Sequence, residues 1–260
     1  MAATLRAVKL GRLPVFQQLC IEEALFYKTN DNWYLFNEGP VGASPTVVLG
    51  ISGKPEKMCN LDLVHRDQVP MIKRFSGGGT VVVDEQTIFG TIIASESDVP
   101  ECRPYPRDIM EWSMVVYSPS FKELASKSGA TLGLRENDYV FGTTKARLSA
   151  RNAQAISRGR WLHHTSFLWT FSAANMAYLQ LPEKQPEYRR QRPHESFLTT
   201  LEDHVPSRDS LWPAFKKGLQ GRFTVHEESM EDVMHIIDGL GGMDTWGEKC
   251  RTKYVGLDGK

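Results

Sequence analysis

The segment KRFSGGGTVVVD, residues 73–84, carries the residue types and spacing best suited to binding a phosphate or a carboxylate. Three consecutive glycines free the backbone to adopt positive φ and to approach a ligand without an intervening Cβ. Consecutive N–H groups that turn inward form an anion-binding nest, and Arg74 adds a permanently ionised fork of donors. Because Thr80–Val83 predict a strand and not a helix, the pattern argues against a P-loop and a Rossmann fingerprint. A glycine-rich hairpin without a ligand is the alternative.

A second group of polar residues lies between residues 136 and 169. It comprises a short acidic strand (ENDYVFG), Lys145 in a flexible loop (GTTKARLSARNAQ), and His163 and His164 before an apolar run (WLHHTSFLW). A lysine beside a phosphate nest would neutralise charge that develops at an α-phosphate, and Asp138 would hold that lysine or a magnesium ion. Taken singly, Lys145 is typical of a solvated loop and the histidines of structural or surface residues. Adjacent histidines with no third ligand nearby argue against zinc.

A series of strands and helices must position these residues. Apolar residues at helical spacing predict a helix over residues 14–27, and β-branched or alternating runs predict strands. The predicted strands are residues 4–10, 32–38, 45–52, 69–76, 80–85, 88–94, 137–141, 153–156, 162–169 and 223–227. The other predicted helices are residues 60–68, 109–117 with a continuation over 121–127, 195–204, 210–221 and 230–240, and residues 181–192 predict a linker. This order predicts an α+β fold, a mixed sheet with helices on one face.

The composition excludes several classes of protein. Lys and Arg number 31, and so do Asp and Glu, so the chain lacks the charge excess of a sequence-independent nucleic-acid or membrane binder. Hydrophobic residues make up 41% of the chain and charged residues 24%, which is typical of a packed globular protein. No apolar run approaches the roughly 18 residues that span a bilayer. The four widely spaced cysteines predict free thiols, with Cys102, on a predicted loop, left open as a reactive one.

Together these motifs resemble those of the lipoate–protein ligase A branch of the biotin/lipoate ligase superfamily. The resemblance rests on RFSGGGTVVVD, on the END, FG, K and NAQ run, on LHHTSFL and on the opening helix FQQLCIEEAL, and it covers about residues 12–240. It implies the class II synthetase-like α+β fold of these catalytic domains, in which helices flank a mixed sheet. It implies a catalytic domain at residues 1–240, followed by a short C-terminal tail, 241–260, without an accessory domain.

The resemblance implies a two-step ligase. Lipoate, or octanoate, and Mg·ATP would give an enzyme-bound acyl-adenylate and pyrophosphate. A lysine on a lipoyl domain of a 2-oxoacid dehydrogenase, or on the glycine-cleavage H protein, would then take the acyl group. Single-domain relatives imply that a separate accessory protein is a further candidate partner, whereas nucleic acid and membranes are not expected. These acceptors point to a mitochondrial or cytoplasmic location. The basic, acid-poor start before Glu22 is typical of a transit peptide, but the strand-like alternation of residues 4–10 favours an uncleaved start.

The resemblance also implies roles for individual residues. Lys145 is the expected catalytic lysine on the acyl phosphate. The expected acyl-adenylate cradle, nucleotide side and acyl pocket comprise Arg74, Ser76, Gly77, Gly78, Gly79, Thr80, Asn137, Asp138, His164 and Ser166. Asp138 is in addition the expected ligand of magnesium, through the nucleotide.

Three departures from the family pattern bear on this expectation. Lys145 is followed by ARLSAR before Asn152, a longer link without glycine. A gapless count back from Asn152 puts Leu148 at the lysine position, so either the loop carries extra residues or the catalytic lysine is lost. Many relatives have a histidine where this chain has Val83. Bacterial ligases often continue into an accessory domain, whereas only a short tail follows Leu240.

These departures leave other functions open. The first is an ATP-independent octanoyl or lipoyl transferase on the same fold, for which Cys102 is the candidate nucleophile if a thioester forms. The second is a catalytically degenerate protein that still binds lipoyl domains or free acyl groups. A biotin ligase is disfavoured because the chain shows no appended DNA-binding or SH3-like module.

Overall fold

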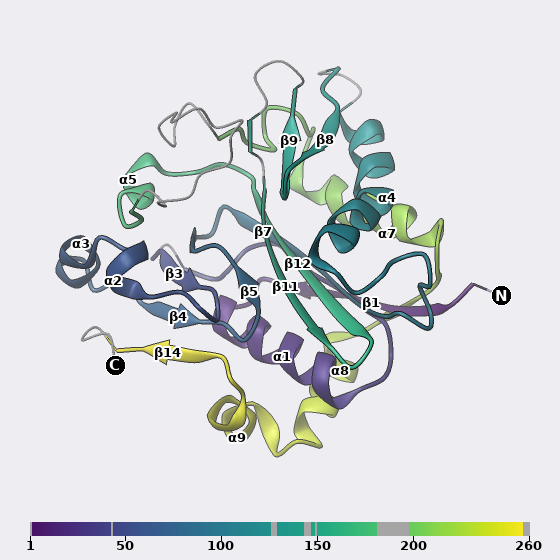
Figure 1. Ribbon diagram of the computed structural model, residues 1–260, viewed down its shortest axis with the longest axis horizontal. Coiled ribbons are helices and arrows are strands. Elements are labelled where there is room, and N and C mark those ends of the chain that lie inside the picture. Colours follow the sequence, from purple (N-terminus) through teal and green to yellow (C-terminus); the bar gives the residue numbers. More distant parts are fainter. Residues whose placement is uncertain are drawn as a thin grey trace.

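The computed structural model describes residues 2–42, 44–125, 129–142, 147–148, 150–180 and 198–256. The strands of this part form a seven-stranded, a four-stranded and a three-stranded sheet (Figure 1). The large sheet runs in the order β13 (Thr224–Glu228), β1 (Thr4–Gly11), β2 (Trp33–Asn37), β7 (Thr87–Ser95), β12 (Arg160–Leu168), β11 (Ala150–Ser157) and β5 (Gly77–Gly78). Strands β13, β1 and β2 are parallel and the remaining pairs are antiparallel, so the sheet is mixed as predicted.

The glycine-rich segment joins two of the sheets. The four-stranded sheet runs in the order β14 (Lys253–Val255), β4 (Met71–Lys73), β3 (Thr46–Leu49) and β6 (Val81–Val83), and the three-stranded one in the order β10 (Arg147–Leu148), β9 (Asp138–Phe141) and β8 (Leu132–Arg135). Between β4 and β6 the chain leaves the four-stranded sheet, and β5 pairs with β11 of the large sheet. The glycine segment therefore forms the turn between β4 and β6 and also connects the four-stranded sheet to the edge of the large sheet.

Helices cover both faces of the large sheet, not one face as the sequence predicted. Helices α1 (Val15–Lys28), α8 (Met230–Asp238) and α9 (Gly242–Lys249) lie on one face, and α4 (Pro106–Leu124) and α7 (Leu211–Gln220) on the other (Figure 1). Shorter helices are α2 (Pro55–Met58), α3 (Leu61–Arg66), α5 (Ala173–Met176) and the 3₁₀ turn η2 (Arg208–Ser210). No helix of this part of the chain is long and apolar enough to cross a membrane.

Side chains from the two faces of the central strands contribute to two hydrophobic cores, one beneath each layer of helices. In β2, Tyr34 and Phe36 join the core beneath α4 and α7, whereas Trp33 and Leu35 join the core beneath α1. Successive side chains of a strand point to opposite faces, so a strand covered on both sides has no solvated face. This explains why β2 is apolar or buried throughout.

The segment after Leu240, predicted to be a tail, is packed against the rest of the fold. Trp246 of α9 is buried with α1 and donates to the Cys20 carbonyl (2.8 Å), and the Tyr254 ring stacks on Phe16 at 4.4 Å. Strand β14 extends the four-stranded sheet beside β4 (Figure 1). The predicted boundary at Leu240 is therefore corrected, because residues 242–255 share a core and a sheet with the elements before them.

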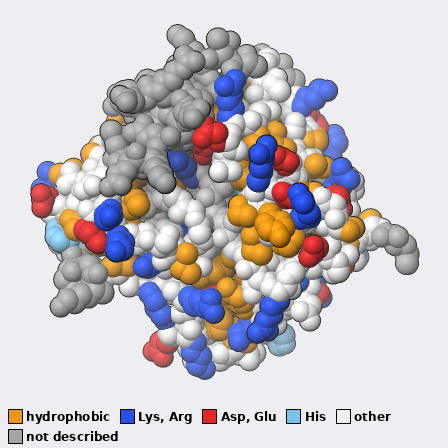
Figure 2. All heavy atoms as spheres, in the orientation of Figure 1, with side chains coloured by type: hydrophobic (Ala, Val, Ile, Leu, Met, Phe, Trp, Pro, Cys, Tyr) orange, Lys and Arg blue, Asp and Glu red, His pale blue; other side chains and the backbone are white. Residues whose placement is uncertain are grey.

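One predicted helix is absent from the described chain. Residues 198–204, within the predicted helix 195–204, form a bridge and turns instead, while residues 195–197 and the predicted linker 181–192 lie outside the described residues. The turns are closed by backbone bonds such as those from the Leu201 N–H to the Leu168 carbonyl and from the Val205 N–H to the Leu201 carbonyl, both 2.7 Å. Figure 2 shows Asp and Glu among the Lys and Arg side chains of one face, in keeping with the balanced composition.

Candidate functional site

A narrow slot lies where α1, the four-stranded sheet and the large sheet meet. Its free volume is about 10 Å³, within about 300 Å³ of space between atoms that includes open solvent. Its apolar lining consists of Val15, Leu19, Val48, Val81, Val83, Phe89 and Ala153, and its polar lining of Arg74, Gly79, Arg151, Asn152, His164 and Ser166. Such a combination suits a ligand with an apolar chain and a charged or polar head.

Arg74 is the buried cation of the slot. Its Nη2 donates to the Gly79 carbonyl (2.8 Å) and the Gly77 carbonyl (3.4 Å), and its Nη1 to the Val48 carbonyl (3.4 Å). Burial lowers the pKa of Arg74 to about 10, with nearby Glu22 acting in the opposite direction, so the guanidinium stays protonated at neutral pH. The Nε–H has no acceptor among the described residues. A buried charged donor without a partner is costly unless a ligand accepts from it.

The glycine segment next to Arg74 packs closely against strand β11. Gly78 has φ +123°, and a Cβ there would lie 2.6 Å from the Asn152 carbonyl oxygen of β11. Ser76 is buried, and its hydroxyl has no partner among the described residues. Gly79 lines the slot, and the half-buried Thr80 follows it just before β6. The segment therefore places a buried hydroxyl without a partner among the described residues close to Arg74.

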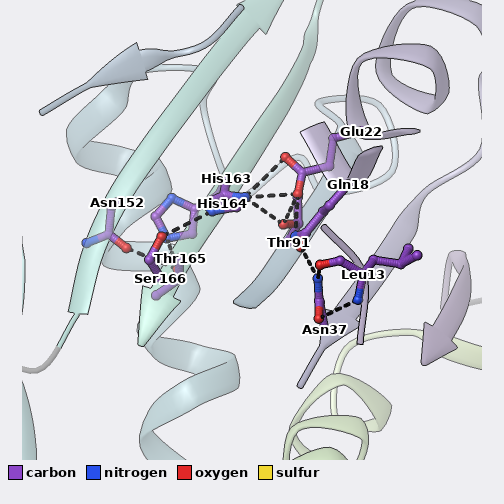
Figure 3. A network of polar contacts seen from close by, with 10 residues as sticks. All are labelled: Leu13, Gln18, Glu22, Asn37, Thr91, Asn152, His163, His164, Thr165 and Ser166. Atoms are coloured by element: carbon purple, nitrogen blue, oxygen red, sulfur yellow. Dashed lines mark hydrogen bonds and ion pairs between the residues drawn. The ribbon is translucent and has the colours of Figure 1, made fainter. Parts of the chain in front are cut away.

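His164 is held between a buried carboxylate and a hydroxyl (Figure 3). Its Nδ1 lies 2.9 and 3.1 Å from the two oxygens of Glu22, and its Nε2 lies 3.2 Å from Ser166 Oγ. Gln18 Nε2 and Thr91 Oγ1 each donate to Glu22 Oε1 at 2.8 Å. Because a carboxylate only accepts, Nδ1 carries the proton of the neutral ring. Nε2 is then free to accept from Ser166.

The adjacent His163 points to the opposite face of β12, into the core. Its Nε2 lies 2.8 Å from Tyr139 Oη and 3.2 Å from Thr165 Oγ1. Burial, helped by the neighbouring His164, lowers the pKa of His163 to about 3, so this ring is neutral at physiological pH. Only one of the two histidines faces the slot, and His163 is a structural residue.

A second hollow adjoins the slot on the side of α4. It encloses about 690 Å³, including open solvent, and is lined by Gly77, Gly78, Pro106, Met110, Asn137, Asn152, Gln154 and Ile156. Asn152 lines both spaces, and its Nδ2 donates to the Asn137 carbonyl (3.3 Å). The structure therefore brings the glycines and Asn137 together.

Asp138, the predicted magnesium ligand, does not face either of these two spaces. Asp138, at the start of β9, is largely buried and lines neither the slot nor the hollow. The described residues contain no group of three or more His, Cys, Asp or Glu side chains that could hold a metal ion. A single carboxylate is compatible with magnesium that is bound mainly through the phosphates of a nucleotide.

Lys145, the predicted catalytic lysine, lies outside the described residues. The last described residue before it is Gly142, and the backbone resumes with β10. Leu148, which a gapless count places at the lysine position, pairs with Val140 of β9.

Cys102 lies in a turn, as predicted, but the structure contradicts the possibility of a reactive thiol there. Its side chain is fully buried in the core beneath α4, and burial raises the pKa of the thiol to about 12. Its N–H donates to the Val99 carbonyl (2.9 Å), in a turn that directs the thiol inward. A thiol that is so hard to ionise and lines neither the slot nor the hollow is unsuited to nucleophilic attack. Cys20, Cys59 and Cys250 are also buried, and none of them lines the slot.

Sequence reasoning missed the residues that hold His164 in place. Glu22, Gln18 and Thr91 were not singled out, and Asn37, which donates to Gln18 Oε1 (2.7 Å), continues the network (Figure 3). A signal was present, because Glu22 follows the buried run Leu19–Ile21 on α1, and a carboxylate buried on a helix requires a partner.

Comparison with known proteins agrees with the fold. The family model for the lipoyl protein ligase A/B catalytic domain matches residues 14–224. Among solved structures, the chain is similar to a bipartite lipoate protein ligase, described with its E2 lipoyl domain, from Thermoplasma acidophilum. The TM-score is 0.72 with 18% identity, over 93% of this chain and 92% of that one. This similarity confirms the predicted fold class.

Two curated proteins with different activities are also similar. The chain is 26% identical over 239 residues to inactive lipoate–protein ligase 2 of Plasmodium falciparum (isolate 3D7), a match that covers 75% of this chain and 62% of that protein. It therefore spans less than two thirds of that relative. The chain is 22% identical over 283 residues to octanoyltransferase LipM of Bacillus subtilis (strain 168), with coverage of 95% and 98%.

Proposed function

The chain belongs to the lipoyl protein ligase A/B catalytic domain family, and from this membership we propose that it is an ATP-dependent lipoate–protein ligase. In the proposed reaction, lipoate and Mg·ATP give lipoyl-AMP and pyrophosphate. The acyl group then passes to the amine of an acceptor lysine, and AMP is released. The observation that carries the proposal is the slot in which an apolar lining meets the buried, partly unpaired guanidinium of Arg74.

The slot and the hollow divide the proposed ligand between them. The apolar side chains of the slot would take the acyl tail, while the Nε–H of Arg74 would donate to an oxygen of the carboxylate or acyl phosphate. Ser76 and the backbone of Gly77–Thr80 would complete the cradle, and Asn137, at the hollow, would lie on the nucleotide side. Magnesium, when bound, would neutralise phosphate charge, with Asp138 as its one protein carboxylate.

Lys145 is proposed to contact the acyl phosphate during activation. A lysine is suited to this role because its ammonium is a compact point charge on a flexible stem. The proposed acceptors are lipoyl domains of 2-oxoacid dehydrogenases and the glycine-cleavage H protein, with a separate accessory protein as a further partner. The proposed location is mitochondrial or cytoplasmic.

A second candidate function is acyl transfer without ATP, from an octanoyl or lipoyl group on a carrier protein. The contact between His164 Nε2 and Ser166 Oγ, inside the slot, favours it, because a base and a hydroxyl serve acyl transfer from any activated donor. The similarity to an octanoyltransferase supports the same candidate.

Lipoate-dependent ATP–pyrophosphate exchange by the purified full-length chain tests the first candidate, with octanoate in a parallel reaction. Wild-type protein is expected to support exchange, and Lys145→Ala to abolish it. Lys57→Ala, which removes an exposed lysine of α2, is the matched control and should retain exchange. No exchange by the wild type, together with octanoyl transfer from an acyl carrier in the absence of ATP, would replace the first candidate by the second.

A further inference from the structure

We propose that Ser166 is an acyl-accepting nucleophile, activated by His164, which Glu22 orients, so that acyl transfer passes through a serine ester. The inference deepens the proposed function and rests on it, because it requires an activated acyl group in the slot. It assigns covalent catalysis to residues on β12 and α1 and not to Lys145.

The three side chains have the geometry of an activated nucleophile. His164 and Ser166 are two residues apart on β12, so both point to the same face, and both line the slot. The Nε2–Oγ distance of 3.2 Å lies within the reach expected of a base and its nucleophile. On the far side of the ring, Glu22 lies 2.9 Å from Nδ1. A buried carboxylate in this position selects the tautomer with a free Nε2 and stabilises the imidazolium that forms.

The surroundings hold this arrangement rigidly. Glu22 is fully buried and is itself fixed by Gln18 and Thr91, each at 2.8 Å, from different elements of the fold (Figure 3). Asn37 in turn fixes Gln18 (2.7 Å). A network in which every member has a partner can hold the imidazole ring in one orientation. The base is therefore positioned before any ligand arrives.

The slot also offers a donor for the charge that attack creates. Addition of an oxygen nucleophile to an acyl carbon places negative charge on the carbonyl oxygen. Arg74 lines the same slot, is 3% exposed, and has an Nε–H without an acceptor among the described residues. This unpaired donor is a second observation, independent of the His164–Ser166 contact, that points to a ligand oxygen in the slot.

Ser166 has no cysteine competitor in the slot. All four cysteines are buried, and the part of the chain that the structure describes places none of them in the slot lining. Apart from the imidazole of His164, Ser166 is the only side chain of that lining with a nucleophilic atom. If a covalent acyl-enzyme forms in the slot, this hydroxyl is therefore where it forms.

The two steps balance without any further reactant. In the first, Ser166 Oγ bonds to the acyl carbon, its proton passes to His164 Nε2, and the bond to the donor breaks, which releases AMP or a carrier thiol. With a thiol leaving group, His164 returns the proton to the sulfur. AMP leaves as a phosphate anion, and His164 then releases the proton to solvent, so that its Nε2 is free again before the second step. In the second, the acceptor amine attacks the ester, the amide bond forms, and the proton lost by the amine restores the Ser166 hydroxyl through His164.

The test separates formation of the ester from transfer to the acceptor. Full-length protein is mixed with octanoyl-AMP or with an octanoyl thioester of an acyl carrier protein, first without acceptor and then with a lipoyl domain. Intact mass and peptide mapping report an adduct and its position, and hydroxylamine reports its chemistry. The variants are Ser166→Ala, Ser166→Cys and, as matched control, Ser120→Ala, a buried serine of α4 that bonds only to helix carbonyls.

We expect wild type and Ser120→Ala to carry one octanoyl group on Ser166 that resists neutral hydroxylamine and is cleaved by alkaline hydroxylamine. Ser166→Ala should carry none and transfer at least about 100-fold more slowly. Ser166→Cys should carry a group that neutral hydroxylamine removes. Normal transfer by Ser166→Ala, or a wild-type adduct on another residue, would overturn the ester and leave the proposed function standing. No adduct and no transfer from either donor by the wild type would overturn both.

Discussion

Replacement of His163 by glutamine should flatten the pH dependence of folding stability below pH 6.5. Burial lowers the pKa of His163 from 6.5 to about 3 in the folded protein. As the pH falls below 6.5, the unfolded chain takes up a proton at this residue, whereas the folded chain does not until about pH 3. The stability that depends on a neutral His163 is therefore fully present above pH 6.5 and is lost as the pH falls from 6.5 towards 3.

The size of the effect follows from the pKa difference. One proton bound by the unfolded state alone costs about 1.4 kcal/mol of stability per pH unit. Between pH 6.5 and pH 5 the wild type therefore loses about 2 kcal/mol through His163. Glutamine does not titrate, and its amide retains a partner for the Tyr139 hydroxyl, which bonds His163 at 2.8 Å. Between pH 6.5 and pH 5 the free energy of unfolding of the wild type should therefore fall by about this amount more than that of the variant.

Urea unfolding at pH 7.5, 6.5, 5.5 and 5.0 measures this shift, since the free energy of unfolding extrapolates linearly in urea. Tyr139→Phe is the control. It removes the hydroxyl next to His163 but leaves the imidazole buried, so it should lower stability by about 1 kcal/mol at every pH and keep the wild-type slope. Parallel curves for wild type and His163→Gln would refute the assignment of His163 as a buried neutral residue.

Three further predictions concern the site and its support. Glu22→Gln keeps the shape of the side chain but removes the charge that orients His164. Single-turnover acyl transfer should therefore slow by about 10- to 100-fold, which is equivalent to one charged hydrogen bond. An unchanged rate would contradict the proposed role of Glu22 in orienting His164. Gly78→Ala, with φ +123° and a Cβ against the Asn152 carbonyl, should weaken lipoate binding in calorimetry, whereas Gly11→Ala, at φ +69° with nothing within 4 Å, should not. Trp246→Ala should cost about 3–5 kcal/mol in urea unfolding; a loss below about 1 kcal/mol would show that the C-terminal segment is peripheral.

The long elements were predictable because their local pattern and their final burial agree. Helix α1 was predicted over 14–27 and spans Val15–Lys28, and the strand predicted over 162–169 is β12, Arg160–Leu168. In both, many apolar residues repeat at the period of the element, so tertiary packing reinforces the local preference. The glycine segment was recognised for the same reason, since the residues themselves permit the backbone geometry.

The elements that were missed depend on partners far along the chain. Strand β14 has only three residues and pairs with β4, which lies much earlier in the sequence, so its own pattern is too short to identify it. Helix α9 begins with Gly242 and contains a single fully packed residue, Trp246. The helix predicted over 195–204 failed for the opposite reason. Long-range bonds such as that from the Leu201 N–H to the Leu168 carbonyl hold the chain in turns despite its local helical pattern.

The candidate site was predictable as a set of motifs but not as a geometry. The sequence places His163 and His164 side by side, and only the pleat of β12 assigns one to the core and one to the slot. Glu22 lies 142 positions before His164, and no local pattern links a glutamate on the first helix to that ring. Cys102 was misjudged because turn residues around it suggested exposure, whereas the turn directs the thiol beneath α4.

The position of these residues bears on how ligation and transfer relate in this chain. Arg74, Glu22, His164 and Ser166 all come from α1, the sheets or the glycine segment, and are held by contacts that do not involve Lys145. Lys145 lies between β9 and β10 in the sequence, and the connection from it to Asn152 is the part that is longer than in the family pattern. A change in that connection would remove activation of the free acid without removing the slot or the base. Loss of adenylation in this fold is therefore compatible with transfer of an acyl group that another reaction has already activated, and exchange and transfer must be measured separately.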